Sequence, residues 1–93
     1  MKVRYRERAF ADLQEIHRFL EPRSPIGARN ILQAIRDAVD EIARTPHGSR
    51  RTSDLDIRVK VLGRYKYKIF YGVSGDTIEI VHIRQAVRRP WKD

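Results

Sequence analysis

Cationic side chains recur through the second half of this chain, where they could act on a phosphate group. Cleavage of RNA by attack of a 2′-hydroxyl needs a group that accepts a proton, cations that stabilise the charged phosphorane and an acid for the leaving oxygen. The residues that could supply the cations are Arg58, Lys60, Lys68, Arg84 and Arg88.

A general base for this chemistry is harder to find. Unshifted lysines are protonated at neutral pH, and the tyrosines within 65–71 are placed as core or interface aromatics. His82 is the candidate base, but it has the same parity as Ile78 and Ile80, which would put it on the buried face of a strand. The residues therefore leave cleavage open.

The basic tail, residues 84–93, is a second candidate surface, suited to binding rather than cutting. Its cations could engage an acidic protein surface or DNA, with Trp91 as an anchor, because Trp is enriched at interface hot spots. Alternatively, Trp91 folds back and caps the core. The candidate target-binding residues are Arg84, Arg88, Arg89, Trp91 and Lys92.

We expect no metal or cofactor. The histidines, His17, His47 and His82, show no ligand spacing with carboxylates, and the glycines form no phosphate-binding loop.

The composition predicts one small basic domain without disulfides. The net charge is +8, and residues 47–93 hold 11 Lys and Arg against 5 Asp and Glu, whereas residues 1–46 hold 9 against 7. This excess in the second half attracts polyanions or an acidic partner, although the same cations could simply solubilise an exposed face.

Cysteine is absent, no apolar run is long enough for a membrane span, and the first ten residues are too charged for a signal peptide. We expect a cytoplasmic protein without a membrane partner.

Hydrophobic periodicity predicts two helices over about residues 7–44, after a short strand at Lys2 to Tyr5. Ser24 and Pro25 mark the start of the second helix as N-cap and first-turn residue, and Thr45-Pro46 ends it. The short connection between the helices predicts an antiparallel hairpin. The apolar stripe of the first helix is Phe10, Leu13, Ile16, His17 and Leu20, and that of the second is Ala28, Ile31, Leu32, Ile35, Ala38, Val39 and Ile42.

A loop over 47–56 then leads to three alternating strands over about residues 56–83. Val59 and Val61 are expected on the dry face of the first of these strands, with Arg58 and Lys60 on the wet face. Gly75 in the Ser74-Gly75-Asp76 turn allows the positive φ of a hairpin. The pattern predicts a single α+β domain over 1–93, with the helical hairpin on a three- to four-stranded antiparallel sheet in the order β-α-α-β-β-β.

The order of elements and four segments together resemble the RelE/ParE superfamily of toxins from type II toxin-antitoxin systems. These segments are AFADLQEIHRFL, TPHGSRR, YKYKIFYGVSGDTIEIVHI and RQAVRRPW. ParE-like members commonly end the last strand with a histidine, two small residues, an arginine and an aromatic or Pro-Trp. In this chain Gln85 stands at the histidine position, Arg88 matches the arginine, and Trp91 follows Pro90.

The resemblance implies one of two mechanisms. RelE-like members cut mRNA on the ribosome with basic residues and a late Tyr or His-Tyr pair, whereas ParE-like members poison DNA gyrase and lack that set. Gln85 cannot titrate, and Trp91 stands where a nuclease would have tyrosine, so we favour a ParE-like growth inhibitor associated with plasmid stabilisation.

The resemblance also implies a cognate antitoxin that lays a helix in a groove or adds a strand to the sheet. The alternatives are a ribosome-dependent mRNA endonuclease and a non-toxic module that only pairs with an antitoxin.

Overall fold

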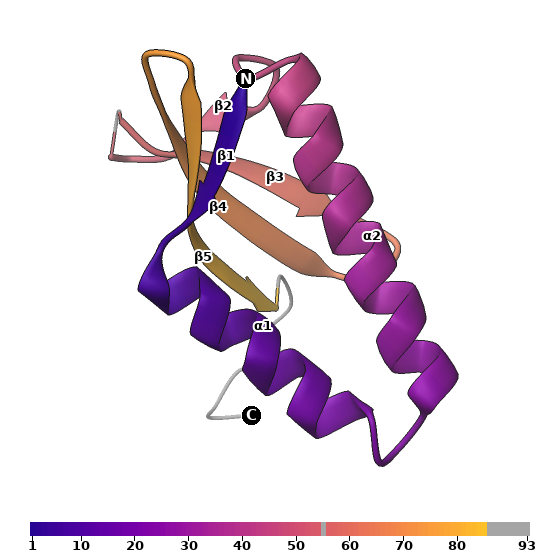
Figure 1. The fold of residues 1–93 in the computed structure, drawn as a ribbon. Coiled ribbons are helices and arrows are strands. Elements are labelled where there is room, and N and C mark those ends of the chain that lie inside the picture. The colour runs from indigo at the N-terminus through magenta and orange to yellow at the C-terminus, as the bar shows by residue number, and fades with distance from the viewer. Residues whose placement is uncertain (55, 86–93) are drawn as a thin grey trace.

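The computed structural model describes residues 1–54 and 56–85. Two helices cover one face of a five-stranded sheet whose strand order is β1-β5-β4-β3-β2 (Figure 1). The elements are β1 (Lys2–Tyr5), α1 (Glu7–Leu20), α2 (Pro25–Arg44), β2 (Arg50–Arg51), β3 (Arg58–Leu62), β4 (Tyr67–Ser74) and β5 (Thr77–Gln85). The predicted α+β fold is confirmed. The sheet has more strands than expected because β2 forms within the predicted loop, and it is mixed because β1 runs parallel to β5.

The local signals at the ends of the elements act as predicted. The Ser24 hydroxyl caps α2 by accepting a hydrogen bond from Gly27 N–H at 3.0 Å, and Pro25 occupies the first turn. Gly75 has a φ of +62° in the turn between β4 and β5, a conformation that glycine adopts without steric cost.

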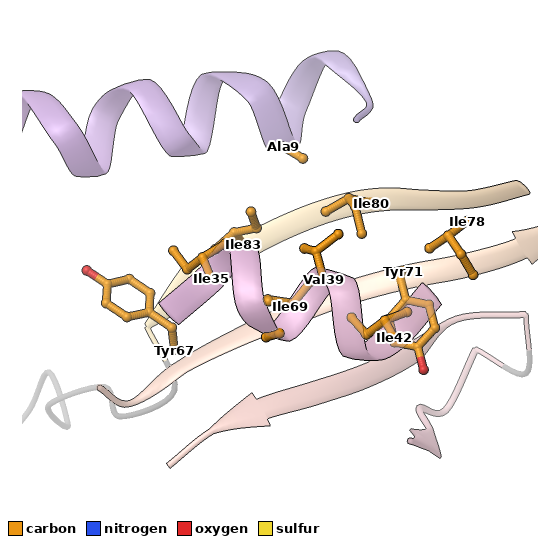
Figure 2. Close-up of a cluster of buried hydrophobic side chains, with 11 residues drawn as sticks. Ala9, Ile35, Val39, Ile42, Tyr67, Ile69, Tyr71, Ile78, Ile80 and Ile83 are labelled. Carbon is orange, nitrogen blue, oxygen red and sulfur yellow. The ribbon is translucent and has the colours of Figure 1, made fainter. Parts of the chain in front are cut away.

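The core lies between the helices and the inner face of the sheet (Figure 2). The predicted apolar face of α2 is confirmed, because five of its seven residues are buried. The largest fully buried side chains are Tyr71, Ile35, Ile42, Ile69, Ile78 and Ile80.

The stripe predicted for α1 is only partly correct. Ala9 is the buried residue of this helix, Leu13 and Ile16 are half-buried, and Phe10 and His17 are exposed. The reason is that α1 diverges from α2 after their connection, so one flank of its stripe has no neighbour to cover it (Figure 1).

The prediction for the two faces of β3 is only partly correct. Lys60 pairs with Ile69 and Arg58 with Tyr71, and directly opposed residues of an antiparallel pair share a face. Both cations therefore lie on the inner face, contrary to the prediction. Val59 lies with Phe70 on the face that the helices do not cover, but it is buried as predicted, whereas Val61 is exposed. Alternation determines which residues share a face, but not which face the helices cover.

The prediction that His82 shares the face of Ile80 is also wrong. Tyr71 pairs with Ile80, but Phe70 pairs with His82, so Val81 is an extra residue in a β-bulge. The bulge shifts the alternation by one residue. Ile83 consequently joins the core, and His82 turns to the outer face.

Candidate functional site

Four side chains on the outer face of β4 and β5 form the candidate site, which we call the outer-face quartet: Lys68, Phe70, His82 and Arg84. The register places Phe70 directly opposite His82 and Lys68 directly opposite Arg84. The Phe70 and His82 rings stack with their centroids 5.9 Å apart and an interplanar angle of 19°. The Arg84 guanidinium carbon lies 5.7 Å from the centroid of the Phe70 ring, within the range of a cation–π contact.

Asp12 of α1 holds the quartet in place from the edge of the sheet. Its Oδ2 atom lies 2.6 Å from His82 Nδ1 and accepts a hydrogen bond from Ile83 N–H at 2.9 Å. A carboxylate only accepts hydrogen bonds, so Nδ1 is the donor in this contact. The side chains of Asp12 and His82 are 13% and 23% exposed, so the pair is largely shielded from water.

This contact depends on how far β1 extends along β5. β1 pairs with Thr77–Ile80, and Arg6 N–H donates to Ile80 O at 2.9 Å. Beyond that point, no strand of residues 1–54 or 56–85 lies beside this edge of β5. The carboxylate of Asp12 takes the place of a strand carbonyl at Ile83.

The structure separates the cations that the sequence grouped as a possible nuclease site. Lys68, His82 and Arg84 come together on the outer face, whereas Arg58 and Lys60 lie on the inner face. Lys60 Nζ is 2.9 Å from Glu41 Oε1, which lowers the pKa of that carboxyl through the hydrogen bond and the charge of Lys60. Arg58 Nη1 donates to Ser49 O at 2.8 Å.

Arg88 and the other tail candidates, Arg89, Trp91 and Lys92, lie outside the described residues. Gln85 ends β5 and lies directly opposite Tyr67. Burial raises the pKa of the Tyr67 hydroxyl, and the neighbouring Gln85 side chain partly offsets that rise. Tyr67 and Tyr71 are buried, which confirms their interpretation as core aromatics.

An open groove between α1, α2 and β1 is the second candidate surface. Its volume is about 860 Å³, and its lining is mainly apolar. Phe10 and Tyr5 are 57% and 39% exposed in it, and Arg18 and Arg36 also line it. The groove therefore combines an apolar floor with cationic side chains.

Within residues 1–54 and 56–85, no group of three His, Asp or Glu side chains is placed to hold a metal ion. In the same residues, no helix is long and apolar enough to cross a membrane.

The comparison with protein families identifies the family to which this chain belongs. Residues 3–90 match the family model described as the ParE toxin of the type II toxin-antitoxin system, parDE. The chain belongs to the ParE toxin family.

Two solved toxin structures share the fold of this ParE-family chain. One is from the chromosomal ParDE toxin-antitoxin system of P. aeruginosa, with a TM-score of 0.68 and 24% identity, and the match covers 94% of this chain and 97% of the other. The other is the crystal structure of the isolated E. coli RelE toxin, with a TM-score of 0.68 and 13% identity over 98% and 89% of the two chains. No curated protein matches the sequence. The ParE-family chain thus has the RelE/ParE superfamily fold, and membership of a type II toxin family implies an antitoxin partner.

Sequence reasoning missed the role of Asp12 in this ParE-family chain. The sequence presents Asp12 only as an acidic residue in the first half of a helix, where it suits the helix dipole. Its contacts are with residues 70 and 71 positions away. No local pattern signals such a contact, because it depends on the packing of α1 against β5.

Proposed function

We propose that this chain is a growth inhibitor that poisons DNA gyrase by binding, and that a cognate antitoxin neutralises it. The match to the ParE toxin family over residues 3–90 carries this proposal. The separation of the cations supports binding over cutting: Arg58 and Lys60 are engaged by Ser49 and Glu41 on the inner face, so they do not converge on a substrate phosphate with Lys68 and Arg84.

The Asp12–His82 pair is the one observation that favours the second candidate, a RelE-like mRNA endonuclease. An imidazole held through Nδ1 presents Nε2 as a proton acceptor, which is what a general base requires. Lys68 and Arg84 would be its nearest cations on the same face.

The order in which DNA and protein synthesis fail distinguishes these two functions. The chain is induced alone in a bacterial host, and incorporation of labelled thymidine and labelled methionine is followed in short pulses. We expect DNA synthesis to fall first while translation continues. Early loss of translation would contradict gyrase poisoning and favour cleavage of mRNA. Unchanged growth would favour the non-toxic pairing module.

The basic tail remains the proposed contact with the target. Reversing two charges in Arg88→Glu/Arg89→Glu should abolish toxicity without unfolding the chain. Arg18→Glu/Arg29→Glu is the matched control, because it makes the same change in net charge at exposed positions on the two helices. Full toxicity of the tail variant, or equal loss in the control, would rule out a specific role for the tail.

We further propose that the antitoxin places one amphipathic helix in the groove between α1 and α2. Apolar residues three and four positions apart on that helix would cover Phe10, Leu13 and Leu32, and acidic residues beside them would face Arg18 and Arg36. Burial of the exposed Phe10 ring would supply part of the affinity through the hydrophobic effect.

Phe10→Glu tests this arrangement, because the side chain is 57% exposed and its replacement should not disturb the core. We expect the variant to stay toxic but to escape rescue by the co-expressed product of a short reading frame beside its gene. Phe19→Glu is the matched control, since Phe19 is equally exposed on the same helix but does not line the groove. Rescue of both variants would place the antitoxin elsewhere.

A further inference from the structure

We propose that the basic tail folds back after Gln85 and seats the indole of Trp91 in a hollow between α1 and the end of β5. The hollow has a volume of about 400 Å³, and its apolar lining includes Ile16, Phe19 and Ile83. This inference is independent of the target that the toxin inhibits, because it concerns a contact within one chain.

The first argument is the place where the tail leaves the sheet. Gln85 ends β5 and itself lines the hollow. Trp91 follows six positions later, within residues 86–93, which lie outside the described residues. A chain spans at most about 3.3–3.6 Å per residue, so this segment extends to about 20 Å. That length is enough for the chain to turn and bring Trp91 back to a hollow that begins at Gln85.

The second argument is the apolar surface that α1 presents to the hollow. Phe19 is 57% exposed, even though the Arg23 guanidinium lies 3.9 Å from the centroid of its ring, and Ile16 beside it is only half-buried. An indole buries about 150–250 Å² when it packs, and contacts between aromatic rings add to that gain. Trp91 is the only aromatic residue after Tyr71. It is therefore the side chain of the tail that gains most from this surface.

The third argument is charge. Glu15 lies on the wall of the hollow, is exposed, and forms no ion pair with another described residue. The other acid of this wall, Asp12, already contacts His82. Lys92 follows Trp91 directly, so the seated indole would bring its ammonium group near Glu15. An exposed pair of this kind contributes little energy, so it orients the tail while the indole holds it.

A seated Trp91 has a consequence for the rest of the tail. Arg88 and Arg89 would lie in a short loop that is fixed at Gln85 and at Trp91. Side chains on a loop that is already ordered lose less entropy when they bind a partner. Trp91 would thus act inside the toxin, and the two arginines would be left to contact the target.

The test uses the intrinsic fluorescence of the full-length chain. Trp91 is the only tryptophan, so excitation at wavelengths that tyrosine does not absorb reports on this residue alone. We expect emission at shorter wavelength, and weaker quenching by acrylamide, than in the same chain unfolded in urea. An emission maximum and quenching equal to those of the unfolded chain would overturn the proposal.

The dependence on protein concentration separates this contact from an exchange between two chains. We expect the shielding of Trp91 to stay constant on dilution, because the hollow and the indole belong to one chain. Shielding that decreased on dilution would place Trp91 in the hollow of a second copy and would overturn the contact within one chain.

Phe19→Ala and Phe10→Ala form a matched pair. Both rings are 57% exposed on α1, but Phe10 lines the groove on the other flank of the helix. We expect Phe19→Ala to shift the emission to longer wavelength and to increase quenching, and Phe10→Ala to leave both unchanged. Circular dichroism should show both variants folded. Equal effects of the two variants, or no effect of Phe19→Ala, would overturn the proposal.

Glu15→Gln and Glu7→Gln test the charge contribution in the same way. Both remove one exposed carboxylate from α1, but Glu7 does not line the hollow. We expect Glu15→Gln to increase quenching of Trp91 at low ionic strength and Glu7→Gln to leave it unchanged. Equal quenching in the two variants would overturn the contact between Glu15 and Lys92.

Discussion

Asp12 satisfies two groups that would otherwise lack a protein partner at the end of the sheet. Ile83 N–H points to an edge that β1 does not reach, and His82 Nδ1 lies beside it. A buried donor left without an acceptor costs about 1–3 kcal/mol. One carboxylate therefore both completes the edge of β5 and orients the imidazole of the outer-face quartet.

Tyr71 offers a test of a single buried hydrogen bond. Its ring is fully buried, and its hydroxyl donates to Pro46 O at 2.9 Å, which ties β4 to the end of α2. We expect Tyr71→Phe to lower the free energy of unfolding by about 1 kcal/mol in urea denaturation. Tyr65→Phe is the control, because Tyr65 makes no hydrogen bond through its hydroxyl to another described residue. Equal losses in the two variants would contradict this role for the Pro46 contact.

Glu79 predicts a contribution to stability that depends on pH. A hydrogen bond and the charge of Arg6 hold the pKa of its carboxyl below the ordinary value of 4.5, and Arg4 adds a smaller effect. Because the folded-state pKa is lowered, the contribution is present above pH 4.5 and is lost as the pH falls through the folded-state pKa. The melting temperature of Glu79→Gln should therefore lie below that of the wild type at pH 7 and converge with it in acid, below the folded-state pKa. A difference that persisted in acid would exclude ionisation as its cause.

At the scale of the elements, the β-bulge at Val81 decides what the end of β5 presents on each face. On its N-terminal side Ile78 and Ile80 point to the core, and on its C-terminal side Ile83 does so while His82 and Arg84 point outward. If Val81 were instead paired in the ladder, strict alternation would place His82 on the inner face and Ile83 on the outer face.

Deletion of Val81 should consequently leave the fold intact. It removes the extra residue, so that His82 directly follows Ile80 and still pairs with Phe70, and Ile83, which is 2% exposed, still pairs with Ile69. Deletion of both Val81 and His82 would instead turn Ile83 to the outer face. The loss of one buried Ile side chain costs about 1.5–3 kcal/mol, against a total stability of about 5–15 kcal/mol for a typical domain. Circular dichroism and thermal denaturation should show the single deletion folded and the double deletion strongly destabilised. An unfolded single-deletion variant would show that the fold needs the bulge itself.

At the scale of the whole molecule, α1 separates two surfaces. Phe10 and Leu13 line the groove beside α2, whereas Asp12 and Phe19 face the end of β5. The antitoxin proposed for the groove would thus contact the flank of α1 that faces away from the end of β5.

An antitoxin that binds only the folded chain should raise its stability by mass action. At a free antitoxin concentration 100 times Kd, the free energy of unfolding should rise by about 2.7 kcal/mol. Thermal denaturation with and without antitoxin measures this effect, which Phe10→Glu should remove and Phe19→Glu should keep. The same stabilisation of all three chains would contradict the proposed groove contact.

Local patterns in the sequence were sufficient to predict the two helices, four of the five strands and the fold class. The bounds of α1 and α2, the Ser24 cap and the hairpin turn at Gly75 follow from periodicity and from the backbone preferences of single residues, which operate over a few positions. Their order was sufficient to predict the α+β fold and the superfamily, and the match to the ParE toxin family confirms the latter.

Which side chains contact one another depends on the tertiary structure. Lys60 and Lys68 both alternate with apolar residues in the sequence, yet Lys60 faces Glu41 on α2 and Lys68 faces outward beside Arg84. The physical reason is that alternation depends on the local geometry of one strand, whereas the covered face depends on pairing and packing between distant segments. The contact of Asp12 with His82, across 70 positions, exists only because α1 continues along the edge where β1 ends.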